Sequence, residues 1–146
     1  MINLLLPAII AGGDYKIKQN REENTEEYEY FDGNIRIVTY HNRGALLNMG
    51  QKKPFVVLML SLIFTAIIGI IFVVSLTFKG RGMLKAGLGL LLGGAFSNSY
   101  DRLKKGYVVD YINFPHAPGK IRQVIFNISD FAIIIGALIS LFNENN

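Results

Sequence analysis

The feature that most constrains this chain is an uninterrupted apolar run near its middle. Residues 54–78, PFVVLMLSLIFTAIIGIIFVVSLTF, form a stretch of 25 residues without a charged side chain. About 20 apolar residues span the hydrocarbon core of a bilayer, whereas a helix on the surface of a soluble domain keeps one polar face. The run therefore predicts a transmembrane helix, and the chain is expected to be a membrane protein.

Three further apolar segments are predicted to cross the membrane. The first opens the chain and could instead be a cleaved signal peptide, although it has no basic residues before its apolar core. We expect a single integral membrane domain, 1–146, which is mainly α-helical: a bundle of four transmembrane helices with a small β-structured cradle outside the membrane. The expected transmembrane segments are about 1–17, 54–78, 83–100 and 127–142, and the cradle insertion is about 19–51.

Two patterns predict strands in the polar parts of the chain. In residues 28–40, YEYFDGNIRIVTY, apolar residues alternate around Asp32-Gly33, which is a strong hairpin signal. A second strand pair is expected to join YVVDYINF to KIRQVIF through HAPG at 116–119. In the third membrane segment, Gly89 and Gly93 form a small-xxx-small pair, which allows close helix packing in lipid.

The composition excludes several kinds of function. The chain has no cysteine, so disulfides, thiol nucleophiles and cysteine-based zinc sites are excluded. Its two histidines stand in no metal-binding motif, and we expect neither a metal nor another cofactor. The net charge of +4 is attributed to cations near membrane lipid headgroups rather than to nucleic-acid binding.

The distribution of lysine and arginine gives an orientation of its own. The connections 15–53 and 101–125 hold seven and five of these cations, whereas 77–85 holds three. Cytoplasmic loops are usually the richer in Lys and Arg. Taken literally, this rule places both polar connections in the cytoplasm.

Four carboxylates stand at the expected membrane boundaries: Asp14, Asp101, Asp110 and Asp130. An ionisable residue inside a membrane is costly, so it usually faces the protein interior and serves a function. Two carboxylates that lie close together in a site of low dielectric share one proton. The ionised member can then activate a water molecule and the protonated member can polarise a peptide carbonyl, which is aspartic-protease chemistry. The spacing does not choose which two residues form the pair.

For several polar residues near these boundaries, a structural role competes with a functional one. Asp130 stands at the start of the last apolar segment and could cap its helix. Asp110 would share a strand face with apolar neighbours, where an unpaired acid is expensive. Asp101 and Arg102 could form an ion pair at a helix end, within reach of Asn98 at i−3 and i−4. The sequence Asn42-Arg43-Gly44 is typical of a tight turn.

Several ordered blocks from Asp14 to Gly136 resemble the lipoprotein signal peptidase, or signal peptidase II, family. GGAFSNSYDRLKKGYVVDYINF at 93–114 is similar to the family's GGAxGNxxDRxxxGxVxDFxxF, and FNISD at 126–130 is similar to its FNxAD. YHNRGAL resembles the family's N-x-G-A turn, and DYKIK echoes D-Q-x-x-K. Three residues depart from these patterns: Tyr15, Ser97 and Ser129 replace Gln, Gly and Ala.

The resemblance implies an aspartic endopeptidase that cleaves diacylglycerol-modified prolipoproteins before the lipidated cysteine. Its implied location is the bacterial cytoplasmic membrane, with several membrane crossings, a monomeric state, and the cradle and active site on the extracytoplasmic side. It also implies Asp110 and Asp130 as the catalytic pair. The residues that would support or line the site are Asp14, Lys18, Asn42, Gly44, Asn98, Asp101, Arg102 and Asn127.

Two other classes of function remain open from the residues. A small transporter or channel subunit could use boundary carboxylates as a proton or cation relay. Such a protein is expected to carry a polar stripe through a membrane helix, which the uncharged 54–78 segment lacks. A non-catalytic relative that binds lipoproteins or lipids is the second alternative.

Overall fold

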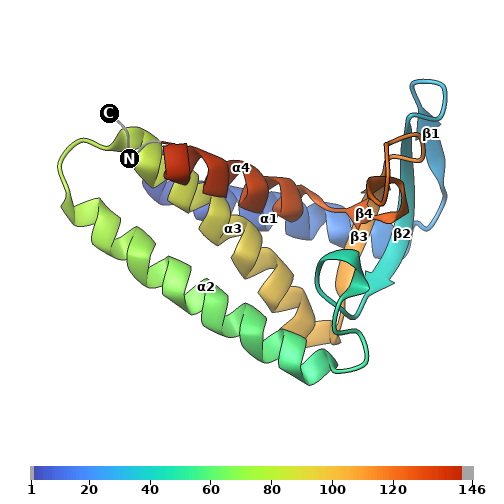
Figure 1. Cartoon of the computed structure of the whole chain (residues 1–146), viewed down its shortest axis with the longest axis horizontal. Coiled ribbons are helices and arrows are strands. Elements are labelled where there is room, and N and C mark those ends of the chain that lie inside the picture. Colours follow the sequence, from blue (N-terminus) through green and yellow to red (C-terminus); the bar gives the residue numbers. More distant parts are fainter. Residues whose placement is uncertain (1, 143–146) are drawn as a thin grey trace.

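The computed structural model describes residues 2–142. Within this range, four α-helices run beside one another and a small sheet lies across one end of them (Figure 1). The helices are α1 (Ile2–Glu23), α2 (Pro54–Thr77), α3 (Gly82–Lys105) and α4 (Ile128–Phe142). The strands are β1 (Tyr28–Tyr30), β2 (Ile35–Asn42), β3 (Val108–Asn113) and β4 (Ile125–Phe126).

The four strands form one antiparallel sheet in the order β1-β2-β3-β4. The hairpin predicted around Asp32-Gly33 is confirmed, because β1 pairs with β2 across this turn. Asp32 and Gly33 both have positive φ, the conformation that a tight hairpin turn requires. The second predicted strand pair is also confirmed, since β3 pairs with β4.

The polar insertion begins later than predicted, because α1 continues to Glu23. The expected boundary followed the end of the apolar residues at Ile17. Residues 18–23, KQNREE, contain no helix breaker. Lys18 and Arg21 in this last part of α1 are buried at 0% and 5% exposure, so tertiary contacts stabilise a helix that apolarity alone does not indicate.

Helix α3 is the central helix, which packs against α1, α2 and α4. The glycines of α3 allow this close packing of helices. A Cβ at Gly93 would lie 2.8 Å from the Pro7 carbonyl oxygen of α1, which is too close for a side chain. A Cβ at Gly87 would lie 2.9 Å from the Gly136 carbonyl oxygen of α4. The predicted glycine face is therefore confirmed towards α1, and a second glycine face lies against α4.

Helix α2 stands apart from this tight group. Only Val57, Phe72 and Ser75 of its residues are buried, whereas Ile63 and Ile70 are more than half exposed. Such an exposed apolar surface requires a lipid environment or a partner. Among residues 2–142, α2 is the one helix whose length and composition suffice to cross a membrane, and α4 is a shorter apolar helix.

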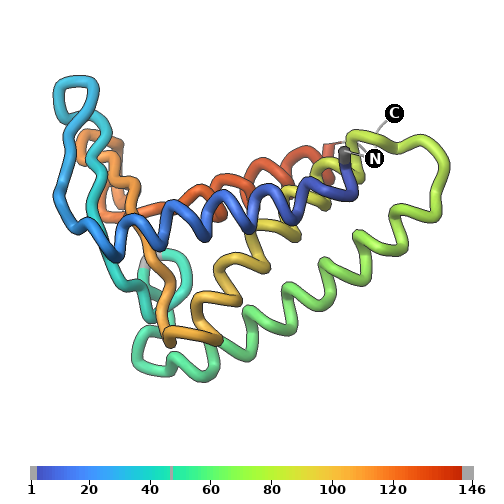
Figure 2. The backbone as a smooth tube through the Cα atoms, turned by 180° about the vertical axis from the view of Figure 1, so that it is seen from behind, coloured from blue at the N-terminus to red at the C-terminus, as the bar shows by residue number. Residues whose placement is uncertain are grey.

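The connections alternate between the two ends of the helices. The start of α1, the end of α4 and the α2–α3 connection lie at the end opposite the sheet (Figures 1 and 2). The sheet and the 43–53 connection lie together at the other end. The last residues of α3 and the first residues of α4 therefore meet the sheet, and the predicted site residues concentrate there.

Candidate active site

Asp110 and Asp130 are brought together where β3 meets the start of α4. Asn127 bridges them: its Nδ2 donates to Asp110 Oδ1 at 2.8 Å, and its backbone N–H donates to Asp130 Oδ2 at 2.9 Å. Asp110 is 3% exposed and Asn127 is fully buried, whereas Asp130 is partly exposed. The two carboxylates therefore belong to one buried hydrogen-bond network with an opening on the side of Asp130.

Each carboxylate also accepts a hydrogen bond from a second amide. Asn42 Nδ2 donates to Asp110 Oδ2 at 3.0 Å, and Asn98 Nδ2 donates to Asp130 Oδ1 at 2.9 Å. Asn98 Oδ1 in turn accepts from Asn127 Nδ2 at 3.0 Å. Within residues 2–142, neither Asp110 nor Asp130 forms an ion pair with a lysine, arginine or histidine. Neutral donors therefore orient both carboxylates without neutralising them.

The environment of Asp110 favours its protonated form. Burial raises the pKa of this carboxyl from 3.8 to about 7, and the negative charge of Asp130 acts in the same direction. The hydrogen bond from Asn42 lowers it only in part. Near neutral pH, Asp110 can therefore hold a proton beside a second carboxylate, as general acid–base catalysis requires.

Asp130 also has the structural role considered from the sequence. It occupies the first turn of α4, and its backbone N–H donates to Asn127 Oδ1 at 2.9 Å while its own carboxylate accepts from the Asn127 N–H. This reciprocal arrangement is a capping box. The cap uses Oδ2 of Asp130, and Oδ1 remains on the side of Asn98. Capping and a place in the site are therefore compatible.

The other two boundary carboxylates form a separate buried ion cluster. Lys18 Nζ lies 2.8 Å from Asp14 Oδ2 and 3.2 Å from Asp101 Oδ2, and all three side chains are at most 1% exposed. The same ammonium group donates to Ser97 Oγ at 3.0 Å and to Asn98 Oδ1 at 3.1 Å. Lys18 therefore connects this cluster to Asn98, whose side-chain amide donates to Asp130.

Asp14 is the most heavily hydrogen-bonded carboxylate of the cluster. Its oxygens accept from the hydroxyl groups of Ser97 at 2.7 Å, Ser129 at 2.5 Å and Tyr111 at 2.6 Å. The sequence marked Ser97 and Ser129 only as departures from a family pattern, and the structure brings both to one oxygen atom. No sequence pattern indicated Tyr111 as a site residue, because strand alternation puts it on the face opposite Asp110.

The ion pair considered between Asp101 and Arg102 is not formed. Asp101 turns to Lys18, Lys105 and the Val109 N–H, whereas Arg102 Nη2 donates to the Gly44 carbonyl oxygen at 2.9 Å. Adjacent residues on an α-helix point about 100° apart, so they face different neighbours. Within residues 2–142, the Asn98 side chain forms no hydrogen bond with the side chain of either residue and bonds Asp130 and Asn127 instead.

The turn after β2 is confirmed and reaches the site. The Gly44 N–H donates to Asn42 Oδ1 at 2.9 Å, which is an Asx turn, and Asn42 also holds Asp110. A Cβ at Gly44 would lie 2.5 Å from the Asn48 carbonyl carbon, so a side chain cannot fit. Arg102 fixes the turn from the end of α3.

A cavity of about 230 Å³ opens beside Asp130 between α2, α3, α4 and the start of the 43–53 connection. Asn98, Arg102 and Asp130 line its polar side. Phe64 of α2 and Ile133 and Ile134 of α4 contribute to its apolar side. An extended peptide with apolar neighbours could therefore reach Asp130 through this opening.

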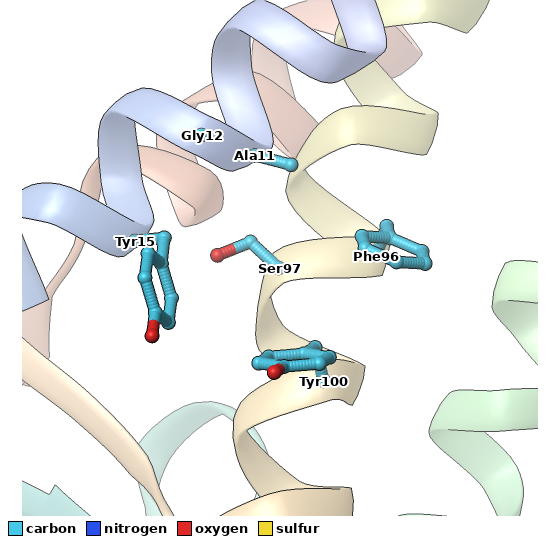
Figure 3. A pocket seen from close by; sticks show the side chains of 6 residues that line it. All are labelled: Ala11, Gly12, Tyr15, Phe96, Ser97 and Tyr100. Carbon is cyan, nitrogen blue, oxygen red and sulfur yellow. The ribbon is translucent and has the colours of Figure 1, made fainter.

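A second cavity, of about 240 Å³, lies between α1 and α3 (Figure 3). It is mostly apolar, with aromatic walls from Tyr15, Phe96 and Tyr100. Ser97 is in this wall as well, but its hydroxyl group already bonds Asp14 and Lys18. Neither Asp110 nor Asp130 lines this cavity, so it is separate from the carboxylate pair.

The fold and the site define a helical membrane protein with two hydrogen-bonded carboxylates where its helices meet its sheet. Residues 6–144 match the model of a family described as signal peptidase (SPase) II. The chain therefore belongs to the signal peptidase II family. This membership does not favour the transporter alternative.

Relatives and solved structures agree with this assignment. A lipoprotein signal peptidase of Moorella thermoacetica is 30% identical over 95% of this chain and 87% of its own length. A lipoprotein signal peptidase of Caldanaerobacter subterraneus is 35% identical over 70% of this chain, and the match covers 66% of that relative. A solved bacterial membrane enzyme has a TM-score of 0.81 at 23% identity, covering 97% of this chain and 85% of that one, so it shares the fold.

Proposed function

We propose that this protein is an intramembrane aspartic endopeptidase that removes the signal peptide from diacylglycerol-modified prolipoproteins, cleaving before the lipidated cysteine. The observation that carries the proposal is the pair Asp110 and Asp130. The two carboxylates are bridged by Asn127, form no ion pair with a cation among the described residues, and lie within residues 6–144, which match the family model.

The chemistry follows from the different surroundings of the two carboxylates. Asp130 lines the cavity, and as the ionised member it takes a proton from a water molecule that attacks the scissile carbonyl carbon. Asp110 gives its proton to the carbonyl oxygen as the tetrahedral intermediate forms. When the C–N bond breaks, Asp130 gives its new proton to the leaving nitrogen and Asp110 recovers one from the intermediate. One water molecule is consumed, and the pair returns to its initial state.

The remaining predicted residues support this pair in two ways. Asn42, Asn98 and Asn127 orient the carboxylates directly. Gly44 and Arg102 hold the turn that carries Asn42. Asp14, Lys18 and Asp101 hold α1 and α3 together beneath the site.

We further propose that all four helices cross the bacterial cytoplasmic membrane and that the sheet lies on its extracytoplasmic side. Helices α1 and α3 contribute polar ends that the sheet and α4 cover. The excess of cations at this end is smaller than the sequence count suggests, because Lys18 and Arg21 are buried within α1. Lys18 is paired with carboxylates and Arg21 donates to the Glu26 carbonyl oxygen, so neither acts as a free loop cation.

Cleavage by the purified protein tests the proposal. Given a diacylglycerol-modified prolipoprotein, the wild-type protein should release the signal peptide, and Asp110→Asn and Asp130→Asn should each lower the rate by at least about a hundredfold. Asp32→Asn, in the exposed β1–β2 turn, is the matched control and should cleave normally. Cleavage that persists in either Asn variant of the pair would rule out the shared-proton mechanism, and no cleavage by the wild type would favour a lipoprotein-binding relative.

A further inference from the structure

A cavity of about 360 Å³ lies between the start of α2 and the end of α3. It shares Arg102 with the cavity beside Asp130, and Arg43, at the start of the 43–53 connection, also lines it. The proposed cleavage reaction does not use this cavity. Its lining residues are Arg43, Pro54, Phe55, Leu58, Arg102, Lys105, Gly106 and Tyr107.

The polar part of this lining is cationic. Arg43, Arg102 and Lys105 line the cavity, and among the described residues no carboxylate does. The charge of Lys105 is offset by Glu22, whose Oε2 lies 3.0 Å from its Nζ, and by Asp101, whose Oδ1 lies 3.8 Å away. Arg43 is exposed and forms no ion pair within residues 2–142. The Nε of Arg102 is buried without a hydrogen-bond partner in the same range.

The start of α2 adds to this positive field. The helix begins at Pro54, and its N-cap residue, Lys53, makes no side-chain hydrogen bond to it. The N-terminal end of a helix carries a partial positive charge, which favours an anion. Pro54 has no N–H group, and the N–H groups of Val56 and Val57 already donate to the Lys53 carbonyl oxygen. Pro54 and Phe55 line the cavity, so this end of α2 borders the same space as the three cations.

The other part of the lining is apolar and belongs to the membrane helix. Phe55 is 70% exposed, and Leu58 follows one turn further along α2. Because α2 has the length of a membrane span, its first turn stands at the level of the lipid headgroups. The cavity therefore places cations at the headgroup level and apolar side chains at the level where acyl chains begin.

We propose that this cavity binds the phosphate of an anionic phospholipid, with Arg43 and Arg102 as its main ligands and acyl chains along Phe55 and Leu58. A phosphate oxygen is an acceptor for the guanidinium groups of Arg43 and Arg102, the two arginines that line the cavity. Arg102 also borders the cavity of Asp130 and holds the Gly44 carbonyl oxygen. A bound phosphate would thereby stiffen the turn that carries Asn42, which holds Asp110.

Lipid binding can be measured without any cleavage. Native mass spectrometry of the detergent-solubilised full chain, titrated with phosphatidylglycerol, should show one retained lipid molecule, whereas phosphatidylcholine should be lost at the same concentration. Arg43→Gln should weaken retention about fivefold, and adding Lys105→Gln should weaken it further, because each cation near an anionic lipid contributes at this scale. The matched control replaces Lys104 and Arg122, which are exposed near the same end but do not line the cavity.

The possible outcomes distinguish a lipid site from no site, from a site for free phosphate and from a site for substrate. Equal retention by Arg43→Gln and the control would overturn the site, and since Arg43 is exposed, its replacement should leave the fold intact. Displacement of the lipid by glycerol 3-phosphate at equal concentration would show a site for free phosphate and overturn the lipid assignment. Displacement by prolipoprotein bound to the Asp130→Asn variant would assign the cavity to substrate instead.

A second measurement concerns regulation and depends on the proposed function. Cleavage by the wild type in vesicles should rise with the fraction of phosphatidylglycerol, and the rise should be weaker for Arg43→Gln than for Arg122→Gln. If lipid is retained in the mass spectrum but no protein cleaves, the proposed function fails and the site stands. If cleavage occurs but does not respond to phosphatidylglycerol, the coupling through Arg102 is wrong.

Discussion

Two pairs of carboxylates lie side by side in this protein, and they differ in the residue that joins the two members of each pair. Asp14 and Asp101 share the ammonium group of Lys18, which is itself fully buried. Asp110 and Asp130 share the amide group of Asn127. Lys18 forms ion pairs with both members of the first pair, whereas within residues 2–142 no cation forms an ion pair with the second, which amide groups orient.

This difference predicts a structural role for the first pair and a role in proton transfer for the second. A buried carboxylate beside a cation stays ionised and connects helices, but it is a weak base. A buried carboxylate among amides keeps a raised pKa and can exchange a proton near neutral pH, as the pKa of about 7 at Asp110 indicates. Asn98 touches both groups, since it accepts from Lys18 and donates to Asp130. If Asp110 and Asp130 act as the proposed acid–base pair, the ion cluster supports that pair through Asn98.

The largest effect is expected when the cation is removed. Lys18→Met leaves Asp14 buried without a counter-charge and Asp101 with Lys105 alone, at 3.8 Å. This change should lower the free energy of unfolding by about 3–5 kcal/mol. The midpoint of thermal unfolding in detergent measures this loss. Lys16→Met, on an exposed part of the same helix, should have little effect. Equal midpoints for the two variants would contradict the structural role of the cluster.

Removal of the Asn127 side chain, which bridges Asp110 and Asp130, should affect catalysis more than stability. Asn127→Ala removes the hydrogen bond to Asp110 and the helix cap at Asp130, so cleavage should fall roughly a hundredfold, while the lost cap costs about 1 kcal/mol. Cleavage rate and unfolding midpoint, measured on one preparation, separate the two effects. Asn113→Ala is the control, since Asn113 bonds only carbonyl oxygens near β4. A rate loss no larger than in this control would remove Asn127 from the site.

The pH dependence of stability should expose the raised pKa of Asp110. In the unfolded chain this carboxyl ionises near pH 4, whereas in the folded protein it keeps its proton up to about pH 7. The folded state binds more protons in this window, so the wild type loses stability as the pH rises from about 4 to 7. Asp110→Asn lacks this loss, and its melting point relative to the wild type should rise between pH 5 and pH 8. A constant difference would mean that Asp110 is already ionised at pH 5.

The smallest effect is expected from the serines around Asp14. Ser97→Gly and Ser129→Ala each remove one hydroxyl donor, although Lys18 and Tyr111 still satisfy the carboxylate. Each change should lower the free energy of unfolding by roughly 1–2 kcal/mol, with cleavage retained. Chemical unfolding of both variants measures this loss. The control is Thr77→Ala at the exposed end of α2, which removes a hydroxyl group that bonds only a carbonyl oxygen of its own helix. Loss of cleavage at unchanged stability would instead place these serines in the catalytic network.

Much of the fold could be predicted from local patterns. The charge-free 54–78 run indicates a membrane helix because its composition leaves no polar face, and Asp32-Gly33 indicates a hairpin because few residue pairs accept positive φ. The end of α1 could not be predicted in this way. Residues 18–23 look like a polar loop, and the contacts of Lys18 and Arg21 with distant residues make them helical.

The sequence by itself determined which chemical groups are present: four carboxylates at the ends of apolar segments, the asparagines among them, and no thiol or metal motif. Only the tertiary structure decided how the carboxylates are divided. Lys18 reaches Asp101 because the glycines of α3 let α1 approach closely, and Asn127 reaches Asp110 because β4 pairs with β3. Whether an aspartate is neutralised or left free to hold a proton depends on such distances between remote residues, which a local pattern does not encode.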